Sequence, residues 1–339
     1  MKRFRKLLSV LISLCIIAAS FAAFGMTANA KSKYNAQKQQ YNSQFSSVNF
    51  CGNQFAFVFY NEGEYELCYT PKYGGYDIPV YKTENYISSV SIKGKFVYFV
   101  DYTDGAICRI RKDGTGLKKL VSIDNAEQSI NYIISGKRLI YHIFEVDFGT
   151  YETTRSDIYT CTLAGKNKTR IVKNADLSSE FTYGNKLYYL KKSRVYSFSF
   201  KTNKSTLVKR IPSGSYLNGM DGNILYYIGY GDSTDSGETV NCYKLNVSTK
   251  KKSKIGTVKC DGTSVHSMIT TDDKVFVVTG TGAGDAFAQL RKGKLDYKSF
   301  ESKYDMCADY MGYFKNKILI QNTDDNYAFL GVVEVATVK

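Results

Sequence analysis

A short run of apolar residues recurs seven times along the chain, and each run follows a two-residue turn signal. The signals pair Gly or a polar residue with Asn, Lys or Asp, and they stand at Gly52-Asn53, Gly94-Lys95, Gly136-Lys137, Gly184-Asn185, Gly222-Asn223, Asp272-Asp273 and Lys315-Asn316. The intervals between them are 42, 42, 48, 38, 50 and 43 residues. A period near forty residues is typical of repeat folds, and above all of β-propellers.

The run after each signal is apolar at successive positions and does not alternate with polar residues. The seven runs are 55–60, 96–100, 139–144, 187–190, 224–228, 275–278 and 318–320. A strand of this kind is buried on both faces of its sheet. Stacked propeller blades create that environment, because each sheet lies between two neighbours.

The second repeat shows how many strands a unit holds. Strands are expected at 86–92, 96–100, 107–110 and 117–122, and polar or Gly-rich turns separate them. The pattern therefore predicts an all-β fold, a β-propeller of four-stranded antiparallel blades over residues 45–339. Seven blades follow from the seven repeats, and six blades are the alternative if the first unit is irregular. The last unit, 309–339, has room for only three strands, so the polar lead-in 31–44 is the candidate for a ring-closing fourth strand.

The first thirty residues have the pattern of a secretory signal peptide. Lys2, Arg3, Arg5 and Lys6 form a basic start, 7–24 is apolar, and Ala28-Asn29-Ala30 supplies a small-x-small cleavage pattern. A retained membrane anchor is the alternative reading. No second long apolar run follows, so we expect a secreted, extracellular protein with no transmembrane segment after cleavage. Non-covalent association with the cell envelope is compatible with this expectation.

Seven cysteines follow the predicted cleavage site, and an odd number forbids complete internal pairing. Cys68, Cys108 and Cys161 fall in the third strands of three consecutive repeats, at sites expected to be equivalent. Adjacent sheets pack about 10 Å apart, whereas a disulfide needs Cα atoms within about 7 Å. These three residues are therefore predicted to be thiols.

The second repeat also carries a resemblance. The stretch from Gly94 to Gly105 contains Tyr102-Thr103-Asp104, and 110–116 reads Ile-Arg-Lys-Asp-Gly-Thr-Gly. Together they resemble a blade of the YWTD propellers of lipoprotein-receptor-like proteins. They are closer to the bacterial relatives of that domain, a family of unknown function exported by Gram-positive bacteria. The motif here lacks the Trp, and only this repeat matches well. The resemblance implies the propeller fold and ligand or protein binding, and the family supplies no catalytic residues.

The chain shows no catalytic signature. Gly-x-Ser-x-Gly, His-Glu-x-x-His and Cys-x-x-Cys are all absent, and 280–285 is Gly-rich but lacks the Lys and the helix of a phosphate loop. Of the two histidines, His142 is expected in the core and His266 in an innermost strand. We therefore expect no enzyme and no cofactor, and the pattern leaves a metal undetermined. Tyrosine pairs such as Tyr188-Tyr189 are expected to fill the gaps between blades.

Charge separates onto two sets of connections. The loops from second to third strands (60–66, 101–106, 144–158, 190–195, 229–240, 279–286 and 321–327) hold fifteen acidic and four basic residues. The turns from third to fourth strands (70–77, 111–119, 164–170, 200–204, 248–254 and 291–298) hold eighteen basic and three acidic. These sets lie at opposite ends of the strands, so an acidic face and a basic face are predicted.

These faces supply the candidate site residues. Ligand binding is expected on the longest acidic-face loops, at Glu145, Asp147, Asp232, Asp235 and Glu238. Polyanion binding is expected on the basic face, at Lys250, Lys251, Lys252, Lys254, Arg291, Lys292 and Lys294.

These expectations combine into one function. The chain is interpreted as an exported, non-enzymatic binding module for a protein or glycan, with a cell-wall polyanion or an envelope protein as partner. Ordinary solvated Lys-rich turns are the plainer interpretation of the basic face. A metal-dependent propeller enzyme, a lyase or a glycan-cleaving one with its site in the channel or the acidic loops, is the alternative function. Nucleic acid is not expected, since no base-stacking motif is present.

Overall fold

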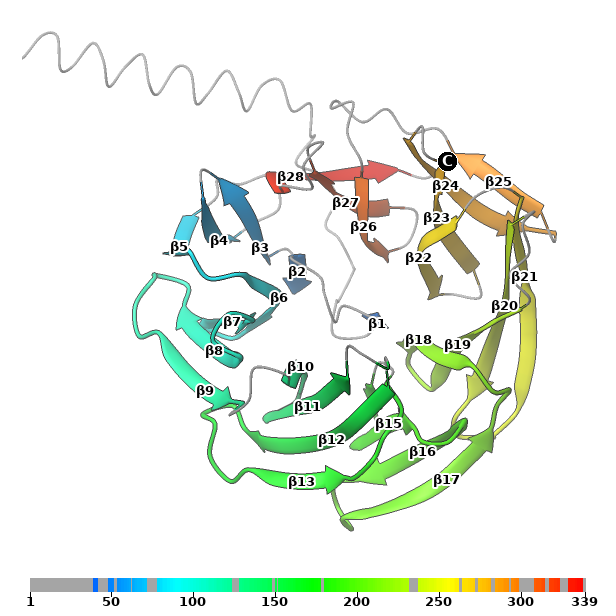
Figure 1. Ribbon diagram of the computed structural model, residues 1–339, viewed down its shortest axis with the longest axis horizontal. Helices are drawn as coiled ribbons and strands as arrows, with labels where there is room; N and C mark the ends of the chain where they lie inside the picture. Colours follow the sequence, from blue (N-terminus) through cyan, green and yellow to red (C-terminus); the bar gives the residue numbers. More distant parts are fainter. Residues whose placement is uncertain are drawn as a thin grey trace, which may run out of the picture.

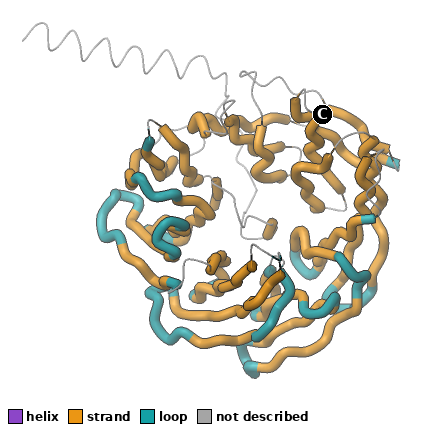
Figure 2. Tube along the Cα trace, in the orientation of Figure 1, coloured by secondary structure: helices purple, strands orange, loops and turns teal. Residues whose placement is uncertain are grey.

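All seven turn signals lie between the first and second strands of separate antiparallel sheets, which stand around a common centre (Figure 1). The structure is a computed structural model. It describes residues 39–41, 48–51, 54–61, 63–71, 78–123, 128–147, 150, 152–177, 180–231, 237–261, 264–271, 274–281, 284–292, 294–298, 308–314, 317–323 and 329–337. This part of the chain consists of strands and loops (Figure 2), and none of it forms an apolar helix of membrane-spanning length.

The strands follow one another through the sheets in chain order. The first sheet holds β2 (Val48–Cys51), β3 (Gln54–Asn61), β4 (Glu64–Thr70) and β5 (Ile78–Thr83). The second holds β6 (Ile87–Lys93), β7 (Phe96–Asp101), β8 (Ala106–Arg111) and β9 (Lys118–Ser122). The third holds β10 (Gln128–Ser135), β11 (Arg138–Asp147), β12 (Glu152–Thr162) and β13 (Thr169–Val172). The fourth holds β14 (Phe181–Tyr183), β15 (Lys186–Leu190), β16 (Arg194–Ser199) and β17 (Lys204–Arg210).

The remaining sheets repeat this order. The fifth holds β18 (Ser215–Asp221), β19 (Ile224–Tyr230), β20 (Gly237–Asn246) and β21 (Lys252–Asp261). The sixth holds β22 (Ser264–Thr271), β23 (Lys274–Thr281), β24 (Gly284–Arg291) and β25 (Lys294–Lys298). Within the described residues the seventh has three strands, β26 (Ala308–Phe314), β27 (Lys317–Thr323) and β28 (Phe329–Thr337). Radially arranged four-stranded antiparallel sheets define a β-propeller, so the predicted fold class is confirmed at this level.

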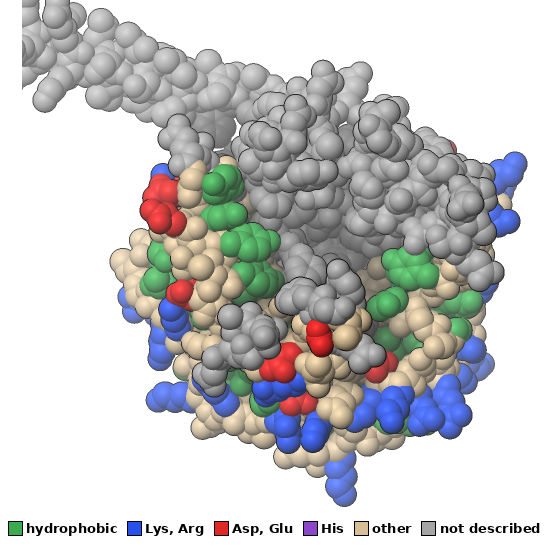
Figure 3. Space-filling model, in the orientation of Figure 1, with side chains coloured by type: hydrophobic (Ala, Val, Ile, Leu, Met, Phe, Trp, Pro, Cys, Tyr) green, Lys and Arg blue, Asp and Glu red, His purple; other side chains and the backbone are tan. Residues whose placement is uncertain are grey.

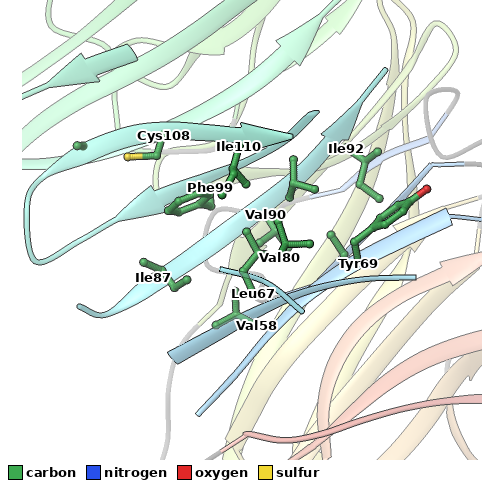
Figure 4. Close-up of a cluster of buried hydrophobic side chains, with 13 residues drawn as sticks. Val58, Leu67, Tyr69, Val80, Ile87, Val90, Ile92, Phe99, Cys108 and Ile110 are labelled. Carbon is green, nitrogen blue, oxygen red and sulfur yellow. The ribbon is translucent and has the colours of Figure 1, made fainter. Parts of the chain in front are cut away.

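The second strands pack on both faces, as their sequence predicts. In β7, Val97 and Phe99 pack toward the first sheet, whereas Tyr98 and Val100 pack toward the third. Successive strand residues point to opposite faces, so one strand contributes to two hydrophobic layers. Figure 4 shows the layer between the first two sheets, where Val58 and Leu67 meet Ile87, Val90 and Ile110. Similar layers join the second sheet to the third, and so on as far as the sixth.

Tyrosines repeat a specific contact in three consecutive sheets. Tyr141 stacks on Tyr159, Tyr189 on Tyr196, and Tyr227 on Tyr243, with centroid distances of 5.3, 5.7 and 4.9 Å. Each pair is a directly opposed pair of residues on the second and third strands. Cross-strand aromatic pairs stabilise sheets. The expected burial of Tyr188 and Tyr189 is confirmed, and Tyr226 and Tyr227 form a second buried pair of the same kind.

Only residues 39–41 of the predicted lead-in lie within the described structure, so its role as a ring-closing strand stays a prediction. Its described residues form β1 (Gln39–Tyr41), which pairs antiparallel with the innermost strand β18 of the fifth sheet, with Gln39 opposite Asp221. An innermost strand has an open hydrogen-bonding edge toward the central channel, and β1 occupies it. Among the described strands, β28 of the last sheet contacts β3 of the first. The predicted signal peptide, 1–30, lies outside the described residues.

The prediction that the three cysteines are thiols is confirmed, but the prediction that their sites are equivalent is wrong for one of them. Cys68, Cys108 and Cys161 are buried thiols on third strands and form no disulfide, and Cys242 is a fourth. Cys68 and Cys108 lie opposite Phe57 and Phe99, four residues beyond their turn signals. Cys161 lies opposite Leu139, two residues nearer to its own signal. The site of Cys161 is therefore not equivalent, because β12 is longer than β4 and β8.

Candidate ligand-binding face

The connections from second to third strands lie on one face of the ring, and the third-to-fourth turns lie on the other. We call them the acidic face and the basic face, as defined by the loop sets given above. Figure 3 looks along the axis of the ring, where hydrophobic side chains gather over β3–β7 and over β18–β19. Acidic and basic side chains lie between and around these two patches.

The basic-face candidates lie on neighbouring sheets. Lys250, Lys251, Lys252 and Lys254 stand at the β20–β21 turn, and Arg291, Lys292 and Lys294 at the β24–β25 turn. All seven side chains are exposed, and β21 contacts both β24 and β25. The β20–β21 turn is held by internal hydrogen bonds, because Asn246 Oδ1 accepts from the backbone N–H of Ser248 and Thr249. Only Arg291 is engaged in an ion pair, with Asp296 at 3.4 Å, among the ion pairs of the described residues.

Two basic residues assigned by sequence to the basic face pair instead with acidic-face carboxylates. Lys119 contacts Asp104, and Arg170 Nη1 lies 3.2 Å from Asp157 Oδ2. Both cations lie on outermost strands, β9 and β13, from which long side chains reach back along the sheet. The charge separation between the faces is therefore weaker than the loop counts predict.

Asp157 is the most strongly embedded of these carboxylates. Burial acts to raise its pKa, but the backbone N–H of Asn174 and the guanidinium groups of Arg170 and Arg155 outweigh burial and hold the pKa below its usual value. A carboxylate with so many internal partners is a structural tie between β12 and β13. It is not a free ligand group.

The ligand candidates from sequence are only partly within the described structure. Glu145 accepts hydrogen bonds from Gln128 and Thr154 and lies 3.8 Å from Arg155. Asp147 is exposed, and its carboxylate accepts a hydrogen bond from the backbone N–H of Thr150. Glu145 is thus occupied by partners on the two neighbouring strands of its own sheet, β10 and β12. Asp232 and Asp235 lie outside the described residues, as do the side chains of Glu238 and His266.

A row of four tyrosines is the feature that sequence reasoning missed. Tyr60 and Tyr65 oppose each other at the end of β3 and the start of β4, Tyr86 lies in the connection from β5 to β6, and Tyr102 follows β7. Successive ring centroids are 4.8, 5.3 and 5.2 Å apart, in the order Tyr60, Tyr65, Tyr86, Tyr102. We call these four residues the tyrosine ladder. Tyr60 and Tyr86 are 37% and 42% exposed, so the expectation of buried tyrosines fails here.

The Tyr102-Thr103-Asp104 motif holds the ladder in place. The backbone N–H of Tyr86 donates to Thr103 Oγ1 at 2.9 Å, and that of Tyr102 donates to the carbonyl oxygen of Tyr86 at 2.8 Å. Asp101 accepts from the backbone of Asp104 and from the Asn85 side chain. The motif therefore fastens the connection between the first and second sheets onto the next loop.

Tyr102 is the anchored end of the ladder. Its hydroxyl shares a hydrogen bond with Ser89 and donates to Asn131 Oδ1 of the third sheet. Burial raises the pKa of Tyr102 to about 12. The pKa of Tyr65 is also raised, first by burial and then by the neighbouring hydroxyls of Tyr86 and Tyr60. The phenols of Tyr65 and Tyr102 therefore stay neutral at ordinary pH.

A second aromatic pair stands on the same face of the fifth sheet. Tyr216 and Tyr230 meet edge to face at 5.9 Å and are 45% and 47% exposed. They lie at the start of β18 and the end of β19. The sequence did carry a signal for both aromatic groups. These tyrosines stand at or next to the ends of strands, where the chain meets the loops, and not at mid-strand positions that would be buried between blades.

One buried constellation has the order of a hydrolase triad. His142 Nδ1 lies 2.7 Å from Glu180 Oε1, and His142 Nε2 shares a hydrogen bond of 2.8 Å with Ser156 Oγ. Ser, His and a carboxylate in this order can generate a nucleophile. Here Ser156 is only 4% exposed, so a substrate does not reach its hydroxyl in this conformation. The constellation instead connects β11 and β12 to the start of the fourth sheet.

The sequence pattern by itself does not assign any metal ligand. Within the residues that the structure describes, His, Cys, Asp and Glu side chains form no group of three or more arranged to hold a metal ion.

Comparison with known proteins supports the fold. Pyrococcus horikoshii acylaminoacyl peptidase matches with a TM-score of 0.55 and 12% identity over 91% of this chain and 53% of its own. The N-terminal domain of Nup159 matches with a TM-score of 0.51 and 9% identity over 90% of this chain and 92% of its own. The Niastella koreensis GH74 enzyme matches with a TM-score of 0.51 and 11% identity over 87% of this chain and 54% of its own.

These similarities show the fold alone. The chain spans about half the length of the peptidase and of the GH74 enzyme. No family model matches, and no curated protein matches. The resemblance to the bacterial YWTD-like family therefore rests on the residues of the second repeat.

Proposed function

We propose that this protein is an exported, non-enzymatic binding module of the Gram-positive cell envelope. Its basic face associates with a wall polyanion, and its acidic face presents the ligand site. We further propose that its seven sheets form a seven-bladed ring, in which packing of β28 on β3 joins the last blade to the first.

The observation that carries the proposal is the pair of lysine-rich turns on adjacent sheets. The cationic side chains at 250–254 and 291–294 are all exposed, and a fixed turn presents the first group. Clustered exposed cations attract polyanions through long-range electrostatics that salt screens. Teichoic acid is the polyanion that such an envelope offers.

Two observations support a binding role over catalysis. The exposed aromatic side chains of the acidic face form fixed surfaces, and exposed aromatics on a rigid scaffold are typical of recognition surfaces. The triad-like constellation is closed off, since Ser156 is buried.

Co-sedimentation with purified cell walls, with and without teichoic acids and across a salt series, tests the basic face. We expect binding that needs the polyanion, falls with salt, and is lost when Lys250, Lys251, Lys252 and Lys254 are replaced by Ala. For a matched control, Lys250→Ala/Lys251→Ala is compared with Lys191→Ala/Lys192→Ala. The second pair removes two charges from the β15–β16 turn on the acidic face. Equal loss in both pairs, or no sedimentation even at low salt, contradicts the proposal.

A further inference from the structure

We propose that the tyrosine ladder is a binding site for a cationic peptide segment, one that carries lysine or arginine side chains. The inference deepens the proposed function, because it assigns the ligand class of the acidic face, but its evidence and its test are independent of the basic face.

The ring geometry favours cations. Tyr60 and Tyr65 are inclined at 47°, and Tyr65 and Tyr86 at 54°. Two inclined rings can both contact one ammonium or guanidinium group, which gains from each ring face that it meets. A sugar ring prefers a flat platform of nearly parallel rings. In the ladder only Tyr86 and Tyr102 approach this arrangement, at 23°, and there each ring covers the other.

The charges around the ladder agree with this choice. Glu64, beside Tyr65, and Glu84, two residues before Tyr86, have exposed side chains. Lys82 lies on the strand next to Tyr65, but Glu66 pairs with it at 3.0 Å, and Glu64 also acts on it electrostatically. Carboxylates at the edge of an aromatic surface add Coulombic attraction to the cation–π contact.

Elsewhere in this protein, Lys and Arg side chains lie over aromatic rings. Lys112 lies over Tyr69 at 4.6 Å, Arg109 over Phe96 at 4.3 Å, and Arg138 over Phe200 at 5.0 Å. Among the described residues, Tyr60, Tyr65 and Tyr86 have no such cation over their rings. The ladder therefore offers to an external cation the contact that these other rings make internally.

The ladder is also fixed before a ligand arrives. Two backbone hydrogen bonds to Tyr102 and Thr103 hold Tyr86, and Tyr102 is anchored to Ser89 and Asn131. A site whose backbone and one anchoring side chain are already held in place loses less conformational entropy on binding. It crosses the boundary between two sheets, so an extended peptide can lie along it.

Fluorescence anisotropy with labelled hexalysine in low salt tests the proposal. Because the protein has a formal charge of +15, general electrostatics oppose binding of a polycation, and binding requires a local site. We expect Tyr60→Ala and Tyr86→Ala each to weaken binding about fivefold or more, and Tyr86→Phe to retain it. We expect Glu64→Gln and Glu84→Gln to weaken hexalysine binding without making it more sensitive to salt concentration.

Tyr183→Ala is the matched control, because Tyr183 is also 41% exposed but stands at the β14–β15 turn on the opposite face. We expect it to leave hexalysine binding unchanged. The proposal is overturned if hexalysine does not bind, if it binds all variants equally, or if neutral chitohexaose binds in its place and depends on the same tyrosines. The ladder variants leave wall sedimentation unchanged, so failure here and failure of the basic-face proposal are separate results.

Discussion

His142 Nδ1 lies 2.7 Å from the carboxylate of Glu180, and both side chains are buried at the junction of the third and fourth sheets. His142 belongs to the second strand of one sheet, and Glu180 directly precedes the first strand of the next. A buried polar pair of this kind orients two sheets whose other contacts are apolar and non-directional.

Removing one member of this pair should be costly. His142→Leu or Glu180→Leu leaves a buried polar partner unsatisfied, and we expect each to lower the free energy of unfolding by about 1–3 kcal/mol. The double variant should lose less free energy of unfolding than the two single variants lose together. Urea unfolding of the four proteins of the cycle measures this coupling. Strict additivity would show that the two residues do not stabilise the fold as a pair.

Ser156 should be chemically inert in the folded protein. Its hydroxyl has the hydrogen-bond partner of a nucleophile, but its burial excludes reagents. We expect a fluorophosphonate probe to leave Ser156 unlabelled under native conditions, as judged by mass spectrometry of the digested protein. Stoichiometric labelling that His142→Leu abolishes would mean that the site opens, and it would favour the enzyme alternative.

Gly165 should not tolerate a side chain. It has a φ of +78°, and a Cβ there would come 2.6 Å from the backbone oxygen of Leu120 in the neighbouring sheet. We expect Gly165→Ala to lower the melting temperature strongly, since the strain of a positive φ, about 1–2 kcal/mol, adds to a backbone clash. Gly184, with a φ of +57° and nothing within 4 Å, supplies the control. Gly184→Ala should show the conformational strain alone, and equal effects would contradict the close approach.

Alkaline pH should destabilise the fold through its buried thiols. Burial raises the pKa of Cys108 to about 12, of Cys161 to about 11 and of Cys242 to about 12. In the unfolded chain a thiol titrates near about 8.5, so the unfolded state releases its protons first. The stabilising contribution of the protonated thiols is fully present below that pH, and it is lost as the pH rises toward and through the pKa values of the folded state.

Urea unfolding between about pH 7 and 11 measures this loss. Cys108→Ala should flatten the slope above about pH 8.5. A folded protein whose four described thiols react rapidly with DTNB at neutral pH would contradict the burial that underlies the prediction.

The repeat, the strand order and the double burial of the second strands were all predictable from the sequence. They follow from local rules: a two-residue turn signal sets the hairpin, and an unbroken apolar run requires cover on both faces. Gly94-Lys95 and Gly184-Asn185 lie at such turns, with both glycines at positive φ. The thiol state of Cys108 also followed, because sheet spacing forbids pairing.

Tertiary structure decided which polar and aromatic side chains meet. Tyr60 and Tyr86 are 26 residues apart in the chain and become neighbours of Tyr65 only when the first two sheets stack. Arg170 was assigned to one face by its turn, yet it pairs with Asp157 because the outermost strand returns its side chain toward the other face. Periodicity determines the direction in which a residue points relative to its own strand. Its distance from residues of another sheet depends on how the sheets stack, and the local pattern carries no record of that distance.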